Sequence, residues 1–124
     1  MKKLKKTLLV GTMILGMMGT VAYGKNSGDF YYKNVNAWVH GYVDIQSNIF
    51  NSYVWCNVSL GGADRDCVKA KYNLKTDKAN IKTRTLKAGH LRDSYTAISG
   101  GAGAKWARLS INYDGQTVKL QKNA

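Results

Sequence analysis

The chain has 124 residues, carries a formal net charge of +12 and contains no proline. A chain of this length forms one domain rather than several. All seven acidic residues are scattered Asp, and the two histidines lie fifty positions apart, which excludes a paired-carboxylate site with Glu and a typical set of metal ligands. No nucleophile elbow is present either. We therefore expect no enzyme, no metal and no cofactor.

Residues 1–24 have the three parts of a secretory signal peptide. Four lysines precede an apolar run at residues 8–18, and Ala22-Tyr23-Gly24 forms a small-x-small cleavage site, with residues 20–22 as a second candidate. The apolar run is shorter than the roughly 20 residues that a membrane-spanning helix needs. We expect a secreted, extracellular protein whose single domain is residues 25–124, with no transmembrane segment after cleavage.

Residues 25–124 keep fifteen Lys and Arg against seven Asp, which gives a net charge of +8. A secreted protein of this charge is attracted to polyanions such as anionic lipid, teichoic acid or pyrophosphate-bearing lipid. We give equal weight to the alternative that the charge only keeps a β-protein soluble and protects its strand edges. No specific nucleic-acid partner is indicated.

Residues 35–45 alternate between apolar and other side chains, as a half-buried strand does. The positions predicted to face the core are Val35, Ala37, Val39, Val43 and Ile45. The other face carries an aromatic stripe, Trp38, His40 and Tyr42, where a strand normally meets solvent. Two interpretations stay open: the stripe packs under a loop or against a partner subunit, such as a second copy in a homodimer, or it is a recognition surface.

Residues 46–51 are predicted to form a polar turn, and residues 53–60 the next strand, with Cys56 inward and Trp55 outward. Gly61-Gly62 follows and suits a two-residue hairpin turn, which needs positive φ. We expect residues 67–74 to return beside this strand, with Cys67 opposite Cys56 and joined to it by a disulfide, which an extracellular compartment permits. The alternation disagrees with this register by one residue, and a bulge or a longer loop at residues 63–66 would resolve the conflict.

The rest of the chain is predicted to contain four further short strands, at residues 79–86, 91–98, 104–113 and 116–121. Turns are expected at residues 75–78 and 87–90, a glycine-rich loop at residues 99–103, and a hairpin turn at Asp114-Gly115, the strongest turn signal in the chain. Six or seven short strands without a helical period predict an all-β fold, a small antiparallel β-sandwich.

Basic residues are densest between residues 69 and 92, where only Asp77 interrupts them. They are Lys69, Lys71, Lys75, Lys78, Lys82, Arg84, Lys87 and Arg92. If the two strands that carry them lie side by side, they form one positive surface that holds phosphates through charge. For any single lysine, a solvated sheet face is the competing interpretation. From this cluster we predict Lys69, Lys71, Lys82 and Arg84 as binding residues, with Trp55 beside the aromatic stripe.

Trp38-Val39-His40-Gly41-Tyr42 resembles the WxHGY motif of the lactococcin 972 family of secreted bacteriocins. Ser47-Asn48 stands in place of that family's Ser-Asn-aromatic element, and Ala88-Gly89 together with ARLSINY at residues 107–113 is similar to its C-terminal pattern. The resemblance implies a small β-sandwich that binds the cell-wall precursor lipid II and blocks septum formation in related Gram-positive bacteria. It also implies that Trp38, His40, Gly41 and Tyr42 are binding residues.

Two other functions fit the same residues. A non-toxic secreted β-sandwich module would bind cell-wall or host polyanions, and its binding would weaken as salt rises. A small secreted inhibitor of another protein would use Trp38, Tyr42 and Trp55 as anchors in the interface.

Overall fold

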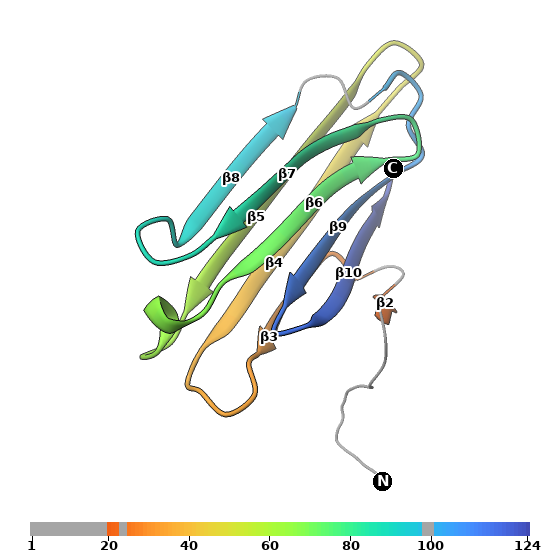
Figure 1. The fold of residues 1–124 in the computed structure, drawn as a ribbon. Helices are drawn as coiled ribbons and strands as arrows, with labels where there is room; N and C mark the ends of the chain where they lie inside the picture. Colours follow the sequence, from red (N-terminus) through yellow and green to blue (C-terminus); the bar gives the residue numbers. More distant parts are fainter. Residues whose placement is uncertain (1–19, 23–24, 98–100) are drawn as a thin grey trace, which may run out of the picture.

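The computed structural model describes residues 20–22, 25–97 and 101–124, so the expected signal peptide lies outside it except for residues 20–22. The described residues form nine strands and one short 3-10 helix, and the strands make two sheets that face each other (Figure 1). This arrangement confirms the predicted all-β sandwich. Among the described residues, no helix is long and apolar enough to cross a membrane.

The first sheet has the strand order β2-β10-β9-β6-β7 and the second has the order β3-β4-β5-β8. The strands of the first sheet are β2 (Thr20–Ala22), β10 (Gln116–Asn123), β9 (Trp106–Tyr113), β6 (Ala70–Thr76) and β7 (Asn80–Leu86). Those of the second are β3 (Ser27–Tyr31), β4 (Trp38–Ser47), β5 (Ser52–Gly61) and β8 (Arg92–Ala97). Neighbouring strands are antiparallel except β2, which runs parallel to β10.

Most of the predicted turns join these strands at or near the expected places. Asp114 and Gly115 have φ values of 47° and 74°, the pair of positive angles that a tight hairpin between β9 and β10 requires. Turns also occur at residues 76–79 and 87–90. Of the predicted loop at residues 99–103, only residues 101–103 are described. The turn between β4 and β5 is present but is not polar throughout, because Ile49 and Phe50 are exposed within it.

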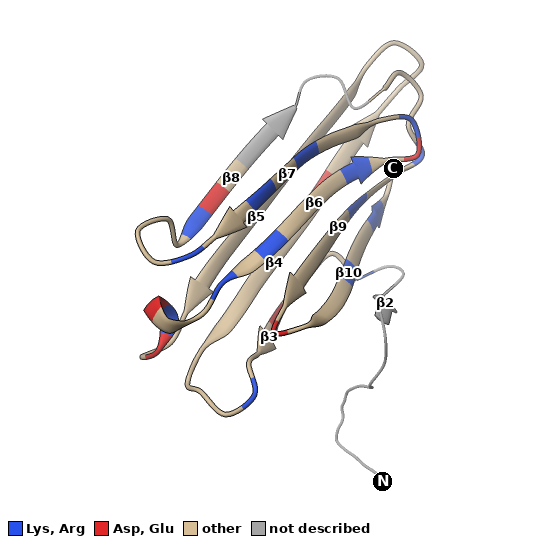
Figure 2. Ribbon diagram, in the orientation of Figure 1, with Lys and Arg blue, Asp and Glu red and all other residues tan. Residues whose placement is uncertain are grey.

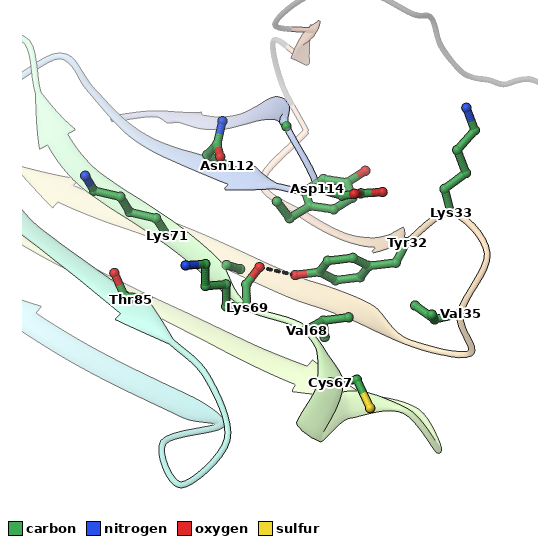
Figure 3. Close-up of a pocket in the computed structure, with 13 residues that line it drawn as sticks. Tyr32, Lys33, Val35, Cys67, Val68, Lys69, Lys71, Thr85, Asn112 and Asp114 are labelled. Carbon is green, nitrogen blue, oxygen red and sulfur yellow. Dashed lines mark hydrogen bonds between the residues drawn. The ribbon is translucent and has the colours of Figure 1, made fainter.

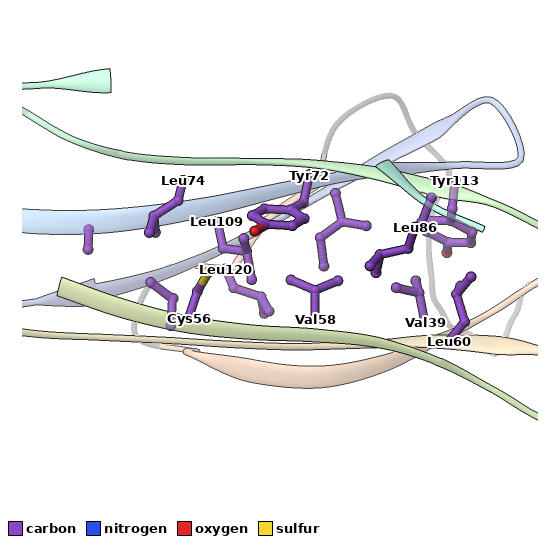
Figure 4. Close-up of a cluster of buried hydrophobic side chains, with 14 of the residues drawn as sticks. Val39, Cys56, Val58, Leu60, Tyr72, Leu74, Leu86, Leu109, Tyr113 and Leu120 are labelled. Carbon is purple, nitrogen blue, oxygen red and sulfur yellow. The ribbon is translucent and has the colours of Figure 1, made fainter. Parts of the chain in front are cut away.

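Apolar side chains from both sheets fill the space between them (Figure 4). The alternation predicted for β4, β5 and β9 is confirmed, since Val39, Val58 and Leu109 are each fully buried. The inward prediction for Val35 is wrong: this side chain is 39% exposed because β4 starts only at Trp38. The predicted strand period is thus right, and the predicted start of that strand is three residues too early.

Gly41 marks a very close approach of the two sheets. A Cβ atom at this position would lie 2.6 Å from Ile111 Cδ1 and 2.9 Å from Leu120 Cδ1, on strands of the opposite sheet. Both neighbours are fully buried and have little room to move. Glycine at this position therefore lets β9 and β10 pack directly against β4.

The predicted hairpin between β5 and β6 is wrong. β5 pairs with β4 and β8, and after Gly61 the chain crosses to the other sheet through the 3-10 helix Arg65–Cys67 before β6 begins. Gly62 has a φ of +103°, but it serves this crossover, where a Cβ would lie 2.3 Å from the carbonyl oxygen of Asn36. The prediction of positive φ at these glycines is thus correct for Gly62, but the interpretation as a two-residue hairpin turn is wrong.

The predicted disulfide between Cys56 and Cys67 is also absent. Cys56 is buried in the core five residues before the end of β5, about 17 Å along an extended strand. Cys67 is exposed in the crossover beyond that end. Disulfide bonding needs Cα atoms within about 7 Å of each other, so the crossover excludes it.

Candidate anion-binding site

The two groups of predicted binding residues lie on opposite sides of the sandwich. Trp38, His40 and Tyr42 point outward from β4, as Trp55 does from β5, and we call the outer side of β3-β4-β5-β8 the aromatic face. Lys71 points outward from β6 on the other sheet, and we call the outer side of β10-β9-β6-β7 the basic face. The structure therefore does not bring these groups into one surface.

On the aromatic face, Trp38 and His40 each contact neighbouring strands. The Trp38 ring lies 5.7 Å from the Tyr31 ring between centroids and covers Gly61, where a Cβ would lie 2.7 Å from the indole Nε1. His40 Nδ1 lies 2.7 Å from Asp29 Oδ1 on β3. Both side chains thus help to hold β3 and β5 against β4.

Gly41 and Tyr42 also have structural roles. Gly41 faces the core rather than the surface, so it cannot contact a ligand on the aromatic face. The Tyr42 hydroxyl donates to the Asp44 carboxylate at 2.8 Å, and this hydrogen bond raises the pKa of Tyr42. All four residues of the WxHGY-like motif therefore have contacts that the fold itself explains.

The basic cluster predicted between residues 69 and 92 does not form one surface. In the register of β6 and β7, Lys82 is opposite Leu74 and Arg84 is opposite Tyr72, and both partners are buried. Lys82 and Arg84 therefore lie on the core side of the edge strand β7 and reach solvent near β8. Lys71, by contrast, belongs to the outward set.

The outward cations of the basic face come from three strands (Figure 2). They are Lys71, Lys75, Arg108 and Lys119. The Arg108 guanidinium stacks on the Trp106 ring at 4.3 Å, and its Nε donates to Gln121 Oε1 at 2.9 Å. No Asp occupies an outward position on the described strands of this face. The sequence prediction missed Arg108 and Lys119, because they are distant in sequence from the dense cluster.

A pocket of about 510 Å³ lies at one end of the basic face (Figure 3). Lys69 and Lys71 line it near the start of β6, and Lys33 lines it from the loop between β3 and β4. The one carboxylate in its lining is that of Asp114, in the turn between β9 and β10. Lys69 and Lys71 were predicted as binding residues. Lys33 was not, because nothing near it in the sequence indicates that the two segments meet.

Two buried tyrosines form the apolar part of the pocket wall. The Tyr32 hydroxyl donates to the Lys69 carbonyl oxygen at 2.5 Å, and its ring packs edge-on against Tyr113 with centroids 5.1 Å apart. Burial, with a smaller contribution from Asp114, raises the pKa of each tyrosine to about 12. Both phenols therefore stay neutral at physiological pH, so the charged residues in the pocket lining are three lysines and one aspartate.

This geometry suits the binding of an anion. Ammonium groups hold phosphate as point charges, and the tyrosine rings together with Val35 and Val68 offer apolar surface beside them. The volume lies within the range of small-molecule sites. Among the described residues, no group of three His, Cys, Asp or Glu side chains could hold a metal ion. The pocket is therefore a candidate site for an anion that is attached to a less polar group.

Comparisons of the chain with protein-family models, with curated proteins and with solved structures found no match.

Proposed function

We propose that the protein is a secreted, bacteriocin-like antimicrobial protein that acts at the envelope of related Gram-positive bacteria by binding a phosphate-bearing envelope component. The observation that carries this proposal is the pocket whose lining has three lysines, Lys33, Lys69 and Lys71, and a single carboxylate residue, Asp114. The N-terminal signal sequence and the resemblance of residues 38–42 to the lactococcin 972 motif support the setting.

Two envelope components present the phosphate chemistry that this pocket suits. Lipid II, the target that the resemblance implies, has a pyrophosphate between a sugar and a lipid, and its capture would block septum formation. Wall teichoic acid has repeated phosphodiesters, which would also attract the cations of the basic face. The second source fits the alternative of a non-toxic polyanion-binding module, because Lys75, Arg108 and Lys119 continue the positive surface beyond the pocket.

Binding measurements with lipid II and with purified teichoic acid separate these two sources. Removing two lysines from the pocket (Lys69→Gln with Lys71→Gln) should weaken binding of the true ligand about 30-fold, at about 1 kcal/mol per lysine. The matched control removes the same charge elsewhere on the basic face (Lys75→Gln with Lys119→Gln) and should weaken pocket binding much less. Equal losses from both pairs would show that the pocket is not the site.

Growth inhibition tests the antimicrobial part. Purified protein spotted on lawns of related Gram-positive bacteria should produce clear zones, and the Lys69→Gln/Lys71→Gln variant should need a higher dose. Salt-sensitive binding to cell walls without killing would instead favour the polyanion-binding module. The proposal would be overturned if the protein did not kill any strain and did not bind either phosphate ligand.

A further inference from the structure

The turn between β4 and β5 exposes two adjacent large apolar side chains. Ile49 is 78% exposed and Phe50 is 76% exposed, more than the other large hydrophobic residues that the structure places at the surface. We call residues 48–51 the hairpin tip. Exposed apolar side chains next to each other at a tip indicate a contact surface rather than a part of the core.

The hairpin tip is held in a defined conformation. Asn48 Oδ1 accepts hydrogen bonds from the backbone N–H groups of Phe50 at 2.8 Å and Asn51 at 2.9 Å. The backbone N–H of Gly103 donates to the Asn48 carbonyl oxygen at 3.0 Å, which ties the tip to the loop before β9. Ile49 and Phe50 therefore project from a built turn, and little conformational entropy remains to be lost when they bind.

Two lysines lie at the same end of the sandwich as the tip. The turn between β6 and β7 brings Lys78, and the segment before β9 brings Lys105. These segments are joined, because Asp77 Oδ1 accepts from the backbone N–H of Lys105 at 2.8 Å. Lys105 also lines a hollow beside Ile49, together with the C-terminal residue Ala124. The carboxylate of Asp77 is thus engaged with backbone, while both ammonium groups are on exposed residues.

Aromatic and basic side chains also meet at this end on the basic face. Trp106, the first residue of β9, is half-buried between cations: Arg108 lies 4.3 Å from its ring centroid and the Lys75 ammonium lies 6.0 Å from it. Tryptophan is enriched at the boundary between a bilayer and water, and lysine is attracted to the anionic headgroups there. The apolar tip, Trp106 and the two lysines therefore lie at the same end of the sandwich.

We propose that this end of the sandwich docks on an anionic phospholipid bilayer, with Ile49 and Phe50 inserted below the headgroups and Lys78 and Lys105 at the headgroup phosphates. The match is one of charge and polarity. Two apolar side chains leave water on insertion, and the two lysines at the same end meet negative charge at the depth where phosphates lie.

The hairpin tip and the lysine-lined pocket lie at opposite ends of the sandwich (Figure 1). Strand β4, whose ten residues run between these ends, is about 33 Å long. In a molecule docked by its tip, the pocket therefore points away from the bilayer. A wall polymer can reach the pocket there, whereas the pyrophosphate of lipid II in the same bilayer cannot. Docking thus goes beyond the proposed function and favours one of its two phosphate sources.

The test uses the full chain with a local readout, because the apolar run at residues 8–18 would partition into any bilayer by itself. Nanodiscs with a paramagnetic doxyl lipid broaden the amide NMR signals of residues that enter the bilayer. We expect broadening at Asn48 to Asn51 with phosphatidylglycerol present, less with phosphatidylcholine alone, and none at Asn34 to Asn36 at the opposite end. The nanodiscs contain neither lipid II nor teichoic acid, so this result and the pocket experiments fail independently.

Two pairs of variants make the result specific. Ile49→Ser with Phe50→Ser should weaken the apparent affinity for anionic nanodiscs, obtained by titrating the broadening of the tip signals, about 100-fold. The reason is that two large apolar side chains no longer leave water. The matched control, Tyr31→Ser with Val35→Ser, removes exposed apolar side chains from the opposite end and should leave it unchanged. Likewise, Lys78→Gln with Lys105→Gln should weaken it about 30-fold, whereas Lys33→Gln with Lys87→Gln should not.

Three results would overturn lipid docking. One is unbroadened tip signals in anionic nanodiscs, and another is equal broadening at both ends of the sandwich. The third is concentration-dependent change at the tip without lipid, which would assign the tip to a contact between two copies of the chain.

Discussion

The two outer faces of the sandwich arise from the same alternation of side chains but differ in how their charged and polar groups are paired. On the aromatic face, polar groups pair with one another: His40 with Asp29, and the Tyr42 hydroxyl with Asp44. On the basic face, the four outward cations of the described strands have no outward carboxylate beside them. Paired groups stabilise the sheet that carries them, whereas unbalanced cations attract an anion. We infer that the aromatic face chiefly maintains the fold and that the basic face chiefly binds.

The largest effect on stability should come from Gly41, beneath the aromatic face. Gly41→Val places a branched side chain where even a Cβ lies 2.6 Å from Ile111 Cδ1, and overpacking of this kind should cost about 3 kcal/mol. Urea unfolding measures the loss. Gln46→Val, at an exposed position of the same strand, is the control and should change stability by less than about 0.5 kcal/mol. A Gly41→Val protein as stable as the parent would show that the sheets separate easily at this point.

Substitution of the buried Cys56 should lower stability more than substitution of the exposed Cys67. Cys56→Ser puts a hydroxyl into the core and should cost about 1–3 kcal/mol, whereas Cys67→Ser should cost less than about 0.5 kcal/mol. Urea unfolding again gives both values, and a thiol reagent should label Cys67 faster than Cys56 in the native protein. Similar losses of about 2–3 kcal/mol for both variants, with neither thiol reactive, would reveal a disulfide.

Local patterns predicted the strands well and their partners poorly. Alternation gave the inward positions of β4, β5 and β9, and Asp114-Gly115 gave a hairpin turn, because both depend on neighbouring residues. The partner of β5 depends on which distant strand covers its other edge, and that is β8. Gly61-Gly62 therefore looked like a hairpin turn although the chain crosses there to the other sheet.

The candidate site shows the same limit. Lys69 and Lys71 stand out in the sequence because they begin a dense basic cluster, and both line the pocket. Lys33 joins them only because the loop between β3 and β4 folds over the start of β6, which no local pattern reveals. Lys82 was predicted with the others, yet the register of β7 places it on the core side of the sheet.

High pH should destabilise the pocket end of the basic face. The pKa of Tyr32 and of Tyr113 is about 12 in the folded protein, above the ordinary value of 10.0 expected for the unfolded chain. The unfolded chain therefore loses these protons at lower pH than the folded protein does. The stability that both phenols contribute is complete below pH 10 and is lost as the pH rises from 10 through 12.

Urea unfolding at a series of pH values across this window measures that loss. Tyr113→Phe should make the fall in stability shallower, because one of the two protons no longer has to be released. Tyr31→Phe, at a 66% exposed ring on the aromatic face, is the matched control and should leave the slope unchanged. A steeper fall in the Tyr113→Phe protein would contradict the assignment of these tyrosines.

The smallest effect on stability, and the most direct test of the comparison, should come from removing charges on each face. Lys71→Gln with Lys75→Gln should change the free energy of unfolding by less than about 0.5 kcal/mol, because neither lysine is ion-paired with a carboxylate among the described residues. The same pair should weaken binding to a phosphate polymer and reduce the dependence of that binding on salt.

On the aromatic face, Asp29→Asn with Asp44→Asn removes the charge of the carboxylates that contact His40 and Tyr42 and so weakens these contacts. These are exposed or half-exposed pairs, so their loss should cost about 0.5–1 kcal/mol in stability. Polymer binding should not weaken, because removing two carboxylates makes the whole protein more positive. The opposite result would reverse the roles of the two faces: weaker polymer binding in the Asp29→Asn/Asp44→Asn variant and lower stability in the Lys71→Gln/Lys75→Gln variant.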